Sequence, residues 1–132
     1  MENKLIFNYD RSAQILFVED QWDVRTAEDV DAFFAEYERY IRTVKEKFWM
    51  VAHIDGLIIH AEVAEYYGQR CRKATNSKLL GLARWGQDGS VRMALRTTAM
   101  KSGMPPKIYS SREEAIQAIE QMKTEQVVTR RS

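Results

Sequence analysis

Hydrophobic positions along the chain follow two different periods, and the change between them predicts where strands give way to helices. Two short runs rich in Ile, Leu, Phe, Val and Tyr, Lys4–Tyr9 and Gln14–Glu19, enclose a mostly polar link of four residues. This pattern predicts a β-hairpin. From Thr26 to Phe48 the apolar residues recur at every third or fourth position, which is typical of a helix with one buried face.

The middle of the chain predicts alternating strands and helices. Phe48–Ile54 is almost continuously apolar, as expected for a strand covered on both faces, and we expect it to end at Asp55-Gly56. The same reasoning predicts a helix at about His60–Ala74, a strand at Lys78–Trp85 and a weaker helix at Ser90–Lys101.

The last part of the chain predicts one more strand and one more helix. Lys107–Ser110 is a short apolar run, and Ser111 and Glu114 have the spacing of a capping box that opens a helix. The residues after Lys123 are mostly polar. We therefore expect one α/β domain over residues 1–125 and a polar tail over 126–132, with a mixed sheet of about five strands and about four helices.

Composition excludes several classes of protein. The 132 residues include 20 Lys and Arg against 19 Asp and Glu, which argues against a protein that coats nucleic acid. Cys71 is the single cysteine, so an intramolecular disulfide is excluded. The apolar runs are far shorter than the roughly 18 residues of a membrane span, and the N-terminus has no pattern of a signal peptide. We expect a soluble, cytoplasmic protein.

No arrangement of residues typical of catalysis appears in the sequence. His60-x-Glu62 matches half of a zinc deaminase motif, but the chain lacks the two cysteines of the other half. Neither a nucleophile elbow nor a glycine-rich phosphate loop occurs. We predict a non-enzymatic protein without a cofactor. A metal site or acid–base chemistry built from Asp55, His60 and Glu62 is the weaker alternative.

The order of the predicted elements, together with two local sequences, resembles a known family. The local sequences are the small turn Asp55-Gly56-Leu57 after the central strand and the segment Ile108–Ala115, a short strand followed by Ser-x-Glu-Glu-Ala. With the hairpin and the acidic start of the first helix, they resemble the STAS superfamily of anti-sigma factor antagonists (SpoIIAA-like) over Leu5–Lys123. The resemblance implies a SpoIIAA-like fold and docking of a protein partner.

One departure from the family removes its best-known switch. Members that act as phosphorylation switches carry a serine at the start of the helix after the central strand, but no Ser or Thr occurs between Asp55 and Cys71. Glu62 would supply a fixed negative charge near that position. The chain is therefore similar to the divergent STAS/SEC14-like branch that lacks the phosphoacceptor, for which docking of proteins or of apolar ligands is expected.

The C-terminal ends of the strands are the predicted binding surface, because ligands of open α/β sheets commonly bind there. Trp85 is the strongest pointer to this surface, since it ends a predicted strand. The predicted binding residues are Asp55, Gly56, His60, Glu62, Trp85 and Gln87.

Two functions are the leading alternatives. The first is a non-enzymatic regulatory or protein-interaction module. The alternative is a binder of a small apolar or amphipathic ligand between the sheet and the helices, suggested by Met93, Met100 and Met104, which otherwise fill the core. Either protein could also form a homodimer through the edge strand of the hairpin.

Overall fold

The computed structural model describes residues 2–74, 78–102 and 107–131, and it begins with the predicted hairpin. Strands β1 (Lys4–Asp10) and β2 (Ile15–Val24) pair antiparallel, with Lys4 opposite Gln21 and Asp10 opposite Ile15. The link closes with Gln14 at a φ of 56°, a left-handed conformation. The hairpin prediction is confirmed, and β2 is longer than the pattern indicated.

The remaining strands pair parallel, so the predicted mixed five-stranded sheet is confirmed. They are β3 (Phe48–Ile59), β4 (Leu79–Trp85) and β5 (Ile108–Tyr109), and the order in space is β1-β2-β3-β4-β5. Helices connect the parallel strands, as the geometry of parallel crossovers requires. The connecting helices are α1 (Ala27–Ile41), α2 (Ala64–Ala74), which follows the 3-10 turn η1 (Ala61–Val63), and α3 (Gly89–Ser102). Helix α4 (Arg112–Arg131) follows β5.

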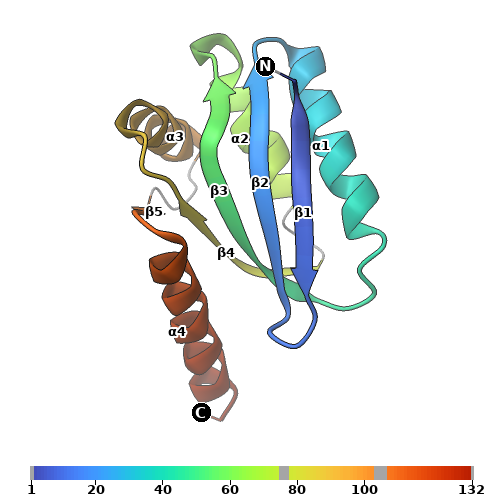
Figure 1. Cartoon of the computed structure of the whole chain (residues 1–132), viewed down its shortest axis with the longest axis vertical. Helices are drawn as coiled ribbons and strands as arrows, with labels where there is room; N and C mark the ends of the chain where they lie inside the picture. Colours follow the sequence, from blue (N-terminus) through green and yellow to red (C-terminus); the bar gives the residue numbers. More distant parts are fainter. Residues whose placement is uncertain (1, 75–77, 103–106, 132) are drawn as a thin grey trace.

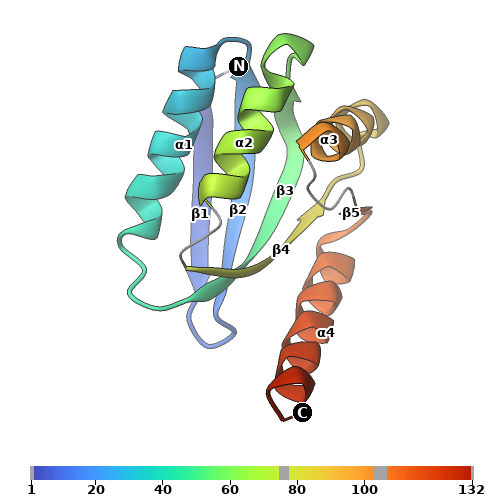
Figure 2. The same cartoon turned by 180° about the vertical axis from the view of Figure 1, so that it is seen from behind.

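The helices cover the two faces of the sheet unequally. Helices α1 and α2 lie behind β1, β2 and β3 in Figure 1 and in front of them in Figure 2, and α3 packs beside α2. On the other face α4 contacts β4 and the start of β3. No helix crosses the front of β1, β2 and the upper part of β3 (Figure 1). One face of these strands is therefore open.

The larger core lies between the sheet and α1 and α2. Helix α1 begins where the pattern predicts, because Thr26 and Asp29 form a capping box. Its buried face places Phe33 against Trp22 of β2, with ring centroids 5.6 Å apart. The smaller core lies under α4, where Trp49 is 4% exposed. Alternation along β2 and β3 separates the two cores, since neighbouring residues face opposite sides of the sheet.

Strand β3 does not end at Asp55-Gly56, so that prediction is wrong. The strand continues to Ile59 through a bulge: Glu19 pairs with His53, but Gln21 pairs with Gly56. Because a side chain at Gly56 would approach the β2 backbone closely, glycine allows the two strands to remain paired past the bulge. The loop expected after Ile54 is thus part of the sheet.

Two other predictions differ from the structure near the C-terminus. Helix α4 extends to Arg131, so most of the expected polar tail is helical. On α3 the inward positions include Leu95 and Ala99, whereas Met93 and Met100 are 69% and 68% exposed. The prediction that these methionines fill the core is wrong, and Met104 lies outside the described residues.

Candidate functional site

Asp55 is an internal structural tie between β3 and the loop that follows β4. Its carboxylate accepts hydrogen bonds from the backbone N–H groups of Gln87 (2.9 Å) and Asp88 (3.0 Å), and it lies 3.1 Å from His53 Nε2. Partial burial raises the pKa of Asp55, but these three hydrogen bonds outweigh burial and lower it. The carboxylate is thus already engaged within the protein, although sequence reasoning placed it on a free binding surface.

Trp85 forms an aromatic pair with His53 across β3 and β4. The ring centroids are 3.9 Å apart and the planes differ by 3°. The other ring nitrogen, His53 Nδ1, lies 3.9 Å from Glu19 Oε1 on β2. Trp85 is therefore half-buried and stacked on His53. His53 is itself partly buried and hydrogen-bonded, at the border of the core.

His60 and Glu62 lie apart from this group: His60 follows the end of β3, and Glu62 lies in η1. His60 Nε2 is 2.8 Å from Asp23 Oδ1, and Asp23 also accepts a hydrogen bond from Arg25. The hydrogen bonds from Arg25 and His60 lower the pKa of Asp23. Glu62 is exposed on η1. The predicted site therefore divides: Asp55, Gln87 and Trp85 come together, whereas His60 and Glu62 belong to a different neighbourhood.

The open face of the sheet carries a groove that sequence reasoning missed. We use "open face" for the side of β1, β2 and the upper part of β3 that lies opposite α1 and α2 and is not covered by α4 (Figure 1). The groove has a volume of about 230 Å³ and lies where this face meets the start of α4. It is called the sheet-face groove below, and its lining residues are Ile6, Asn8, Phe17, Val18, Glu19, Val51, His53, Trp85 and Arg112.

Arg112 stands at the α4 side of the sheet-face groove. Its guanidinium lies over the ring of Phe17, with Cζ 4.2 Å from the ring centroid. In the described parts of the chain, its N–H groups have neither a hydrogen bond nor an ion pair. Ser111 Oγ accepts a hydrogen bond from the Glu114 N–H, and the Glu114 carboxylate accepts hydrogen bonds from the N–H and hydroxyl of Ser110. These bonds fix the first turn of α4 and with it the position of the Arg112 backbone. The groove therefore contains a held cation with unused donors.

The alternation of β2 was the signal that could have revealed this groove. Phe17, Glu19 and Gln21 face the side opposite to Leu16 and Val18, and they change from apolar to polar along the strand. Such a change indicates a sheet face that is covered at one end and solvated at the other. The contribution of Arg112 had no comparable signal, because it depends on where α4 crosses the sheet.

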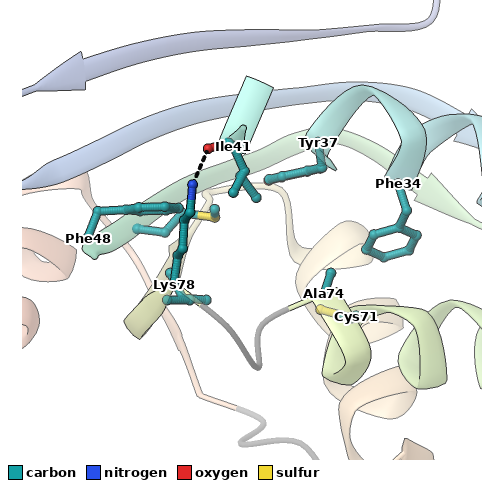
Figure 3. A pocket seen from close by; sticks show the side chains of 9 residues that line it. Phe34, Tyr37, Ile41, Phe48, Cys71, Ala74 and Lys78 are labelled. Carbon is teal, nitrogen blue, oxygen red and sulfur yellow. Dashed lines mark hydrogen bonds between the residues drawn. The ribbon is translucent and has the colours of Figure 1, made fainter. Parts of the chain in front are cut away.

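A second cavity lies inside the larger core but is small. Its volume is about 30 Å³, and its lining is almost entirely apolar, from α1, α2 and the starts of β3 and β4 (Figure 3). Lys78 stands beside it and donates a hydrogen bond to the carbonyl oxygen of Ile41 (3.2 Å; Figure 3) and another to that of Val44 (2.7 Å). This volume corresponds to about one water molecule. The cavity cannot accommodate an apolar ligand without movement of the helices.

Three further observations bear on function. In residues 2–74, 78–102 and 107–131, no three His, Cys, Asp or Glu side chains are grouped so that they could hold a metal ion. None of the helices in these ranges is long and apolar enough to cross a membrane. Comparison with models of protein families, with curated proteins and with solved structures finds no match to the chain. The likeness to STAS proteins stays a prediction, and the functional argument rests on the geometry.

Proposed function

We propose that the protein is a non-enzymatic, STAS-like interaction module that docks a protein partner on the open face of its sheet. The observation that carries this proposal is that large apolar side chains remain exposed there. Ile6 on β1 is 43% exposed and Ile58 on β3 is 42% exposed. Their neighbours along the strands, Leu5 and Phe7 on β1 and Leu57 and Ile59 on β3, face the larger core, so Ile6 and Ile58 face the opposite side of the sheet.

The chemistry of the open face favours a protein partner. On this face Ile6, Phe17 and Ile58 lie among polar and charged side chains, which are Asn8, Glu19, Gln21, Asp23 and Arg112. Apolar patches with a polar rim mark interaction surfaces. The resemblance to STAS proteins supports the same function, and the missing phosphoacceptor favours a surface of fixed charge.

Cavity size argues for a protein rather than a free ligand. Sites for drug-sized molecules have volumes of about 300–1,000 Å³ and enclose most of the ligand. The sheet-face groove, at about 230 Å³, and the core cavity, at about 30 Å³, are both smaller. A third hollow, beside β5 and the start of α4, reaches about 430 Å³, but it is wide open to solvent and its lining is largely polar, so it would not enclose an apolar ligand. A partner protein needs no enclosing cavity, because it supplies the rest of the interface itself. We therefore propose protein docking ahead of the small-ligand alternative.

Site-specific photo-crosslinking tests the docking surface. The photoreactive residue p-benzoylphenylalanine is placed at Ile6 or at Ile58, and at Met93 in a control, since Met93 is also apolar and is even more exposed (69%) but lies on α3. After irradiation in the source cells, Ile6 and Ile58 should both yield one heterologous adduct of the same mass. Met93 should not yield this adduct.

Two results would contradict the proposal. If Met93 yields the same adduct to the same extent, docking is not specific to the open face. If the only adducts have twice the mass of the chain, the open face binds a second copy of this chain and not a different protein. Circular dichroism of each variant shows whether the substitution has preserved the fold.

A further inference from the structure

The charge of the sheet-face groove points to the chemistry of the docking segment. Arg112 is held against Phe17, yet its guanidinium donors have no acceptor in the described parts of the chain. A guanidinium presents its N–H groups in a planar fork that matches a carboxylate, and the contact with the Phe17 ring restricts where that fork lies before an anion binds. Less conformational freedom is therefore lost when an anion binds.

The surroundings of Arg112 limit which anion fits. Glu19 also lines the groove, where its carboxylate accepts a hydrogen bond from Gln21 at 3.0 Å. Arg112 is the only Arg or Lys among the groove's lining residues, so it can compensate one negative charge. A phosphoryl group carries close to two negative charges at neutral pH, and its second charge would have no cation beside it and would face the Glu19 carboxylate.

The groove also offers apolar surface beside the cation. Ile6, Val51 and the edge of the Phe17 ring contribute apolar lining, and the stacked pair of His53 and Trp85 forms an aromatic wall. Its volume of about 230 Å³ corresponds to about eight water molecules at their volume in the liquid. This space suits one or two side chains of a docked segment.

We infer that the partner segment docked here carries an acidic side chain next to an apolar or aromatic one, its carboxylate bound by Arg112 and its neighbour against Phe17 and Trp85. This inference rests on the proposed docking function. It adds that the docking segment is acidic and not phosphorylated.

The test uses the full chain and two blocked dipeptides that differ in one group, N-acetyl-Phe-Glu-amide and N-acetyl-Phe-Gln-amide. Binding is followed by NMR through the Arg112 Nε–H and Trp85 Nε1–H signals. The glutamate peptide should shift both signals and bind about tenfold more tightly than the glutamine peptide, because hydrogen bonds to a charged group are the stronger ones. A phosphoserine counterpart, N-acetyl-Phe-phosphoserine-amide, should bind more weakly than the glutamate peptide.

Substitutions assign the effect to Arg112. Arg112→Gln should abolish the preference for glutamate, and Arg112→Lys should keep only part of it, since lysine lacks the planar fork. Arg39→Gln is the matched control, because Arg39 is exposed on α1 and paired with Glu36. It should bind both peptides as the unmodified protein does.

The outcomes separate this inference from the proposed function. Equal binding of the glutamate and glutamine peptides, or an unchanged preference in Arg112→Gln, would overturn the acidic segment. Tighter binding of the phosphoserine peptide would also overturn it and would indicate a phosphorylated partner. If Ile6 and Ile58 still cross-link one partner in those cases, docking on the open face stands without the acidic segment.

Discussion

The phenol of Tyr37 donates a hydrogen bond of 3.1 Å to the carboxyl group of Asp20 inside the larger core. Asp20 points from β2 towards α1 and is 3% exposed. Burial raises its pKa to about 7, although the hydrogen bond from Tyr37 and the charge of Arg84 lower it. Burial also raises the pKa of Tyr37 well above its ordinary value, so Tyr37 stays protonated and keeps donating.

The raised pKa of Asp20 predicts that the protein is less stable at pH 8 than at pH 5. In the unfolded chain the carboxyl group loses its proton near its ordinary pKa of 3.8, whereas in the folded protein it retains it up to about pH 7. Unfolding between these values releases a proton, so rising pH favours the unfolded state until about pH 7. Between pH 5 and pH 8 about two pH units lie below the folded-state pKa, so the loss should be at most about 3 kcal/mol, at about 1.4 kcal/mol for each unit.

Urea denaturation at pH 5 and pH 8 measures this effect, with Asp20→Asn as the comparison. The asparagine variant does not titrate, so its stability should change much less between the two pH values. The carboxylates with a lowered pKa, such as Asp55 and Asp23, titrate below pH 5, so they do not contribute to the change in stability between pH 5 and pH 8. Equal pH dependence in both proteins would show that Asp20 is not the titrating group.

There is no room for a side chain at Gly81 on β4. A Cβ atom at this position would lie 2.6 Å from Cζ3 of Trp49, which is buried under α4. Gly81→Ala should therefore destabilise the protein by about 1–3 kcal/mol, the usual cost of overpacking a core. Thermal unfolding measures the loss.

Gly89→Ala is the matched control for that substitution. Gly89 opens α3, and a Cβ atom there would meet nothing within 4 Å. It should be neutral or slightly stabilising, because alanine restricts the unfolded chain. Equal destabilisation by both substitutions would refute the steric explanation.

Local patterns predicted most of the fold because each relied on neighbouring residues. The capping box at Thr26 and the alternation of β1 and β2 depend on contacts within a few positions or within one hairpin. The bulge that carries β3 past Gly56 was not predictable in this way. It depends on how closely the β2 backbone approaches, and Asp55-Gly56 read alone resembles a turn.

Asp55→Asn should loosen the loop after β4. The substitution removes the charge that strengthens the hydrogen bonds from Gln87 and Asp88, so a loss of about 1–2 kcal/mol is expected. The amide protons of Gln87 and Asp88 should also exchange faster with deuterium. Because the pKa of Asp55 is lowered, its stabilising effect is present at neutral pH and disappears only as the pH falls below about 4.

Glu62→Gln is the control for Asp55→Asn, since it makes the same chemical change on the exposed η1 turn. Its effect on stability should stay within about 0.5 kcal/mol. If exchange at Gln87 and Asp88 is unchanged in Asp55→Asn, the carboxylate does not hold the loop.

The candidate site was harder to predict than the fold because its residues meet across distant elements. Trp85 was identified from its place at the end of a strand, but its partner His53 comes from a neighbouring strand. Arg112 reaches Phe17 only because α4 crosses the face of β3 and β4. Sequence spacing contains neither relationship, which is why it grouped His60 and Glu62 with Asp55 instead.

We expect the thiol of Cys71 to be unreactive while the protein is folded. It lies on the face of α2 that packs towards the sheet and is 8% exposed. Burial raises the pKa of the thiol, although the charge of Arg84 and its hydrogen bond to Sγ (3.9 Å) lower it. Since the thiolate is the nucleophile, both low access and a raised pKa should slow reaction with a disulfide reagent.

Reaction with 5,5′-dithiobis(2-nitrobenzoate) at pH 8 measures this reactivity. The folded protein should react at least about 100-fold more slowly than the protein in 6 M guanidinium chloride, because reaction requires local or global opening. The control is Met93→Cys in a Cys71→Ala background, which places a thiol on the exposed side of α3. It should react quickly in the folded state. If native Cys71 reacts as fast as this control, α2 separates from the sheet far more often than its packing against the larger core allows.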